Sequence, residues 1–197
     1  MSALPGWGVS FDPALRSPGY AFWFDGVLRA AGALKGAKRP ARGPAAWAEI
    51  ARQLHTETYV TGAVPDWVVV EQQRKYPRKR VRFDDLLELA GVAGAAVRTA
   101  NATTAIGYYP DQWKGEVPKD VTEARARALL TPAELAVVED EDKSDTWDAI
   151  GLGLVALGRL SAPRSTVARA STPARRGAPR RSARGVRAIR SNSRSAP

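Results

Sequence analysis

The segment from Trp67 to Glu71 constrains the fold more than any other part of the sequence, because a tryptophan and three valines run without a polar residue up to a final carboxylate. Strands that lack polar alternation are buried on both faces, as in parallel sheets covered by helices. We therefore expect a sheet with helices on its faces, in which Glu71 stands at the carboxyl end of a buried strand.

The surrounding sequence predicts the other elements of such a sheet. Upstream, Ser17 to Gly19 and the pair Asp25 and Gly26 are typical of turns and divide the chain into three antiparallel strands. These strands are expected at residues 7–11, 20–24 and 27–34, a further strand at 103–109, and helices at 45–59, 83–97, 118–130, 132–138 and 145–160. Three hairpin strands followed by alternating helices and strands predict an α/β fold, a mixed sheet with helices on both faces.

Charge divides the chain near residue 160. Of 30 basic residues in the whole sequence, ten are arginines within residues 161–197, a segment with no acidic residue and almost no large apolar residue. Such a composition cannot bury enough surface to offset the entropy of ordering, so we predict a disordered Arg-rich tail at 161–197. Residues 1–160 are balanced in charge and are expected to form one domain.

Several classes of protein are disfavoured by what the sequence lacks. The absence of Cys excludes disulfides and thiolate zinc sites and favours a reducing compartment. The start of the chain does not resemble a secretory signal, and the longest apolar run, 149–157, is too short to span a bilayer, so a cytoplasmic protein without membrane contact is expected. No phosphate-binding loop or nucleophile elbow is found, and the single His55 is interpreted as a surface or packing residue.

Four carboxylates could converge on one metal site. Asp12 and Glu71 end predicted strands, and Asp145 and Asp148, three residues apart, share one face of the last predicted helix. Ligands gather where the carboxyl ends of strands open beside helix termini. Such a cluster would bind two Mg²⁺ ions, with Mn²⁺ as an alternative, and two ions can activate water for phosphodiester cleavage.

The residues alone leave a plainer explanation open for each carboxylate. Asp12 before Pro13 is also typical of a turn, Asp145 favours a helix N-terminus electrostatically, and Glu71 could be a solvated strand end. Asp148 is harder to explain in this way, because the helix that follows it is almost wholly apolar. A carboxylate at the mouth of a buried helix needs a partner.

The order of these motifs resembles the RuvC-type Holliday junction resolvases of the ribonuclease H-like superfamily. Residues 8–21 (GVSFDPALRSPGYA) are similar to the first hairpin of that family, 68–73 (VVVEQQ) to its second acidic motif, and 144–153 (SDTWDAIGLG) to its last. The resemblance covers residues 7–160. It implies a ribonuclease H-like fold and a Mg²⁺-dependent endonuclease of DNA recombination and repair. The catalytic metal ligands that it implies are Asp12, Glu71, Asp145 and Asp148.

The resemblance also implies catalytic lysines and a dimer. Residues 109–119 look like the region that supplies lysines near the scissile phosphate, with Lys114 and Lys119 as candidates. The helix at 83–97 corresponds to one that helps form a homodimer, in which two sites cut opposed strands of a four-way junction. The sequence departs from the family at Ala14, where glycine is usual, and at Arg74, where an aromatic residue is frequent.

A basic run follows Glu71 directly and predicts contact with DNA beside the metal site. Basic residues supply phosphate contacts, and an aromatic residue can stack on an unpaired base. The candidate DNA-binding residues are Arg74, Lys75, Tyr76, Arg78, Lys79, Arg80, Arg82, Lys114 and Lys119. A solvated basic loop is the alternative. Rival functions are a nuclease of the same fold acting on flaps or RNA:DNA hybrids, a non-catalytic DNA-binding protein, and a basic protein that acts through its tail.

Overall fold

The computed structural model describes residues 4–34, 43–60, 64–73, 82–115, 117–139 and 144–161. Most of the predicted DNA-binding run, from Arg74 to Arg80, and the predicted disordered tail beyond residue 161 lie outside the described residues.

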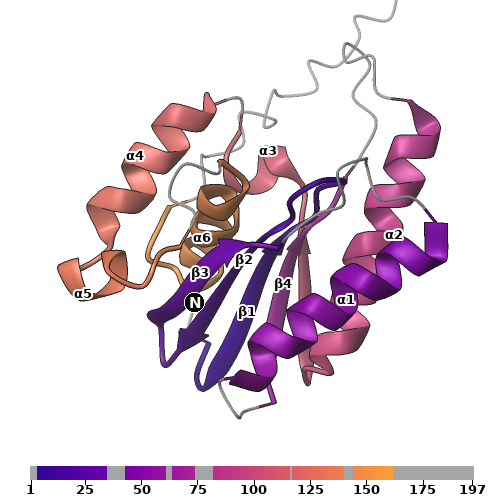
Figure 1. The fold of residues 1–197 in the computed structure, drawn as a ribbon. Coiled ribbons are helices and arrows are strands. Elements are labelled where there is room, and N and C mark those ends of the chain that lie inside the picture. The colour runs from indigo at the N-terminus through magenta and orange to yellow at the C-terminus, as the bar shows by residue number, and fades with distance from the viewer. Residues whose placement is uncertain are drawn as a thin grey trace, which may run out of the picture. The chain divides into compact units, whose positions relative to one another are not determined.

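Within these ranges the chain forms a five-stranded sheet in the order β3-β2-β1-β4-β5 (Figure 1). The strands are β1 (Trp7–Asp12), β2 (Gly19–Phe24), β3 (Val27–Ala33), β4 (Trp67–Glu71) and β5 (Thr104–Tyr108). The first three are antiparallel neighbours, whereas β1, β4 and β5 are parallel. The predicted mixed sheet is confirmed.

Helices cover both faces of the sheet, as the sequence of β4 requires (Figure 1). They are α1 (Gly43–Val60), α2 (Phe83–Ala100), α3 (Pro110–Trp113), α4 (Lys119–Leu129), α5 (Pro132–Leu135) and α6 (Ser144–Ala156). One face is covered by α1 and α2, and the other by α6, against which α4 packs. Val68 and Val70 belong to one cluster of buried side chains, and Trp67 and Val69 to another, so successive residues of β4 point into opposite halves of the core.

The turn between β2 and β3 follows the sequence prediction. Asp25 has a φ of 47° and Gly26 a φ of 77°. Positive φ at both central residues is typical of the type I′ turn. Its backbone twist matches the right-handed twist of the two strands that it joins.

The last helix is shorter than predicted. We expected it to reach residue 160, but α6 ends at Ala156, and Gly158 has a φ of 71°. The amides of Arg159 and Leu160 then donate to the carbonyl of Leu154. A glycine in the left-handed region is a common helix end, because it lets the next amides satisfy the free carbonyls. Among the described residues, no helix has the length and apolar composition of a membrane span.

Candidate metal centre

The register of the parallel strands brings two of the predicted ligands to one edge of the sheet. Phe11 of β1 is paired with Val70 of β4, so the next residues, Asp12 and Glu71, lie at the same strand ends. Both are buried, with 6% and 4% of their surface exposed. Glu71 is therefore not the solvated strand end that the sequence left open as an explanation.

Helix α6 reaches this edge because β2 leaves room for it. Gly19 is paired with Asp12 across the β1–β2 ladder, and a Cβ atom at Gly19 would lie 1.9 Å from the carbonyl oxygen of Asp145. The first turn of α6 therefore rests on the backbone of β2. Carboxylate oxygens of Asp12, Asp145 and Asp148 all lie within 4.8 Å of one another.

The two predicted lysines contact these carboxylates. Lys114 Nζ lies 3.0 Å from Glu71 Oε2 and 2.9 Å from Asp148 Oδ2, so it links Glu71 to the three aspartates. Lys119 Nζ lies 3.1 Å from Asp145 Oδ1 and 3.6 Å from Asp148 Oδ2. The lysine side chains differ in exposure, at 16% for Lys114 and 57% for Lys119. The structure thus brings together all six residues predicted to be catalytic: Asp12, Glu71, Lys114, Lys119, Asp145 and Asp148.

Negative charge exceeds positive charge in this cluster. The pKa of Asp12 is raised well above its usual value, first by burial and then by repulsion from Glu71 and Asp148, with Lys114 acting in the opposite direction. Burial disfavours the charged form of Lys114, but attraction to Glu71 and Asp148 outweighs it and raises the pKa of that amine. Lys114 therefore stays protonated at neutral pH.

The donor atoms fit a hard divalent cation. Four carboxylates supply only oxygen, which is the donor set that Mg²⁺ and Mn²⁺ prefer. A bound cation would also relieve the repulsion that raises the pKa of Asp12. Because Asp12 and Asp148 are buried while Asp145 is partly exposed, the cluster opens toward solvent on the side of α6 and Lys119.

The residues that hold these groups in place were not predicted from the sequence. Trp113 Nε1 donates to Glu71 Oε2 at 2.9 Å, and Gln73 Nε2 donates to Glu71 Oε1 at 2.8 Å. The hydroxyl of Ser144 accepts a hydrogen bond from Lys119 at 3.0 Å. Gln73 lies two residues beyond Glu71, which places it on the same side of an extended chain, and this spacing could have indicated it.

Of the predicted DNA-binding run, Arg82 alone lies in the described part of the chain. Its side chain is 74% exposed and approaches Asp84 at 3.7 Å. His55 is exposed on α1, in agreement with its interpretation as a surface residue.

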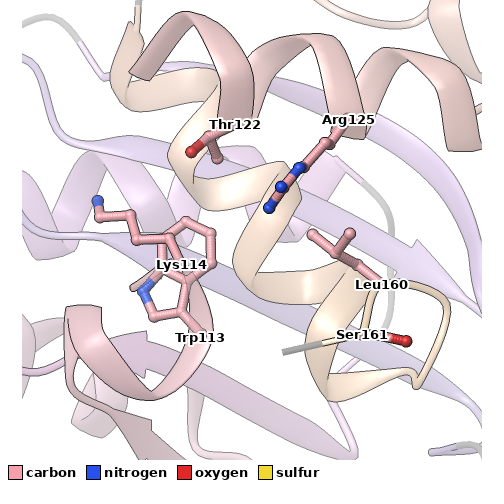
Figure 2. Close-up of a pocket in the computed structure, with 6 residues that line it drawn as sticks. All are labelled: Trp113, Lys114, Thr122, Arg125, Leu160 and Ser161. Carbon is pink, nitrogen blue, oxygen red and sulfur yellow. The ribbon is translucent and has the colours of Figure 1, made fainter. Parts of the chain in front are cut away.

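A small recess adjoins the site. Its lining residues are Trp113, Lys114, Thr122, Arg125, Leu160 and Ser161 (Figure 2). Figure 2 shows the amine of Lys114 pointing away from the guanidinium of Arg125.

The chain is similar to known proteins in its structure but not detectably in its sequence. No protein-family model and no curated protein sequence matches it. The RuvC of Thermus thermophilus in complex with a Holliday junction substrate superposes with a TM-score of 0.55 and 17% identity, covering 80% of this chain and 99% of that one. The same RuvC solved separately gives a TM-score of 0.49 over the same shares at 17% identity. The yeast mitochondrial Holliday junction resolvase Ydc2 gives 0.44 at 14% identity, covering 80% of this chain and 81% of that one. The superposition on the junction-bound RuvC shows that the chain has the same ribonuclease H-like fold.

Proposed function

We propose that this protein is a metal-dependent endonuclease of the RuvC type that cleaves phosphodiester bonds in branched DNA. The observation that carries the proposal is the convergence of Asp12, Asp145 and Asp148, with ligand oxygens within 4.8 Å of one another, at the strand ends of a ribonuclease H-like sheet. Glu71 joins this group through Lys114. The fold shared with a RuvC solved on a Holliday junction supports the choice of DNA junctions as substrate.

The four carboxylates would hold the catalytic ions, for which we propose two Mg²⁺, with Mn²⁺ able to replace them. When bound, such ions supply an activated water and stabilise the charge that develops on the phosphate oxygens. Asp12 and Glu71 would act from the strand ends, and Asp145 and Asp148 from the first turn of α6.

The lysines would stabilise negative charge on the phosphate and would not act as general bases. A general base must lose its proton near the working pH, and the raised pKa of Lys114 keeps that amine charged. A fixed positive charge next to the carboxylates can stabilise negative charge in the transition state. Lys119, with its more exposed side chain, is placed to contact DNA as it arrives.

We propose the rest of the DNA surface and the assembly from the sequence, with partial support from exposure. Arg82 and the preceding basic run would contact phosphates, and the Arg-rich tail at 161–197 would add non-specific affinity. Phe83 and Leu87, one turn apart on α2, are 65% and 54% exposed, and they would be covered by a second copy of the chain in a homodimer. We propose that the protein acts in the cytoplasm, in DNA recombination and repair.

The test is incubation of the purified protein with a synthetic four-way junction and Mg²⁺, beside matched duplex, flap and RNA:DNA hybrid substrates. We expect cleavage of the junction that stops when the metal is chelated. Preference for the flap or hybrid would instead favour another nuclease of this fold. Binding without cleavage of any substrate would make the protein a non-catalytic DNA-binding protein and overturn the proposal.

A further inference from the structure

We propose that Trp113 is a positioning residue, whose indole N–H sets the orientation of the Glu71 carboxylate for cation binding. The inference rests on the proposed function, because it concerns the same carboxylates. It adds a residue that lies within the lysine region, residues 109–119, but was not among the predicted site residues.

The contact between the two side chains is buried. Trp113 Nε1 donates to Glu71 Oε2 at 2.9 Å, and the two residues are only 1% and 4% exposed. Because an indole N–H only donates, it uses one lone pair of the oxygen and leaves the other for a cation. In this structure Lys114 Nζ takes the second position, 3.0 Å from the same oxygen. Trp113 can therefore orient Glu71 without competing for the place of the ion.

The indole ring cannot readily turn away from Glu71. It is carried by α3, a short turn in which the side chain of Gln112 accepts from the amide of Tyr109 at 2.8 Å. On its other side the ring packs against α6, where a Cβ atom at Gly151 would lie 2.8 Å from it. The ring is thus carried by a hydrogen-bonded turn and packed against α6, which restricts the direction of its N–H.

Glu71 is fixed at both oxygens. Gln73 Nε2 donates to Oε1 at 2.8 Å while Trp113 donates to Oε2. Lys114 Nζ also lies 4.7 Å from the centre of the Trp113 ring, so the same ring contacts the amine that pairs with Glu71. Groups that hydrogen-bond to metal ligands commonly change metal affinity by about 10- to 100-fold when removed.

The chain supplies a matched control in Trp67. This residue is also 1% exposed, and its ring packs against a glycine, Gly8, as that of Trp113 packs against Gly151. Its Nε1, however, has no hydrogen-bond partner among the described residues. Replacement of either tryptophan by phenylalanine removes a similar buried volume, but only Trp113→Phe removes a hydrogen bond to a carboxylate.

The experiment titrates Mg²⁺ alone against the full-length protein and its variants W113F and W67F, and follows the rise in melting temperature. We expect both variants to melt below the unaltered protein in metal-free buffer, because both lose packing. W113F should need about tenfold more Mg²⁺ than the unaltered protein to reach half of its full rise in melting temperature. W67F should keep the midpoint of the unaltered protein. Equal midpoints for W113F and W67F would overturn the inference.

A measurement on the unaltered protein covers the case in which W113F does not fold. Mg²⁺ should shift the assigned ¹⁵N-indole resonance of Trp113 and leave that of Trp67 in place. If Mg²⁺ shifts the backbone amides of Asp145 and Asp148 without moving the Trp113 indole, the inference fails while the metal site stands. Absence of any response to Mg²⁺ would overturn the inference together with the proposed function.

Discussion

Two sites with buried carboxylates, one around Asp12 and one at Glu134, differ in how many of their charges are balanced by other groups of the protein. Glu134 is 3% exposed and accepts hydrogen bonds from the amides of Leu28 and Thr131 and from the guanidinium of Arg159. The donors outweigh the effect of burial and lower its pKa to about 2. At Asp12 burial and neighbouring carboxylates act together, and the pKa is raised.

The contrast separates a balanced ion pair from a cluster with unbalanced negative charge. Arg159 also donates to the carbonyls of Gly26 and Leu129, so its pair with Glu134 joins the β2–β3 turn, the end of α4 and the segment after α6. Every group there has a partner within the fold. A surplus of like charge, as around Asp12, costs stability and indicates a functional site.

The largest effect should come from Asp12→Asn. We expect junction cleavage to fall to the level of the metal-free protein, because a neutral amide is a poor ligand for Mg²⁺. The melting temperature in metal-free buffer should not fall, since a repulsive charge is removed. Gel assays of junction cleavage and thermal melts check these two expectations. Glu134→Gln is the control, because it should still cleave the junction at any temperature below its melting temperature.

Glu134→Gln should produce the opposite result, a loss of stability without a loss of chemistry. Removing one partner of a buried ion pair costs roughly 3 kcal/mol, because the remaining charge loses its partner. The matched control is Glu123→Gln, whose carboxylate pairs with Arg127 at 2.9 Å but is 36% exposed and should contribute less than about 1 kcal/mol. Urea denaturation measures both, and equal losses would mean that burial does not distinguish the two pairs.

Acid should remove the contribution of Glu134 in a defined range. Its pKa is near 2 in the folded protein and 4.5 in the reference state, so its stabilisation is present above about pH 4.5 and is lost as the pH falls toward 2. The loss is on the order of 3 kcal/mol by linkage. Free energies of unfolding at pH 5, 4 and 3 should converge for the unaltered protein and Glu134→Gln; a constant difference would contradict the assignment.

The smallest effect is expected from Lys119→Met. Its side chain is 57% exposed, and one of its two carboxylate partners, Asp148, also pairs with Lys114, so the metal site should persist. DNA affinity should decrease, and the slope of log affinity against log salt should become shallower by about 1. Binding measured at several salt concentrations without added metal checks this, and an unchanged slope would show that Lys119 does not contact phosphate.

The sequence was sufficient to predict the ends of the central strands. A hydrophobic run followed by a carboxylate placed Asp12 and Glu71 correctly, because burial and strand termination are local properties of the chain. The spacing of Asp145 and Asp148 likewise placed them on one face of α6, and their oxygens do approach Asp12. The roles of these residues stay predictions.

Contacts between distant side chains could not be predicted in this way. Trp113 is 42 residues from Glu71, to which it donates a hydrogen bond. Glu134 is 106 residues from Leu28, and it accepts a hydrogen bond from the amide of that residue. Such pairs depend on how helices pack on the sheet, and no local pattern records that packing. Helix α3 was missed for a related reason, because its four residues are too few for a helical periodicity.

Gly19 has a consequence for how related sequences should be interpreted. A single methyl group there would collide with the carbonyl of Asp145 and lift the start of α6 from the sheet. The helix would carry Asp145 and Asp148 away from Asp12, although every acidic residue would still be present. A homologue with a bulkier residue at this position could therefore retain the complete acidic signature and yet be an inactive pseudoenzyme.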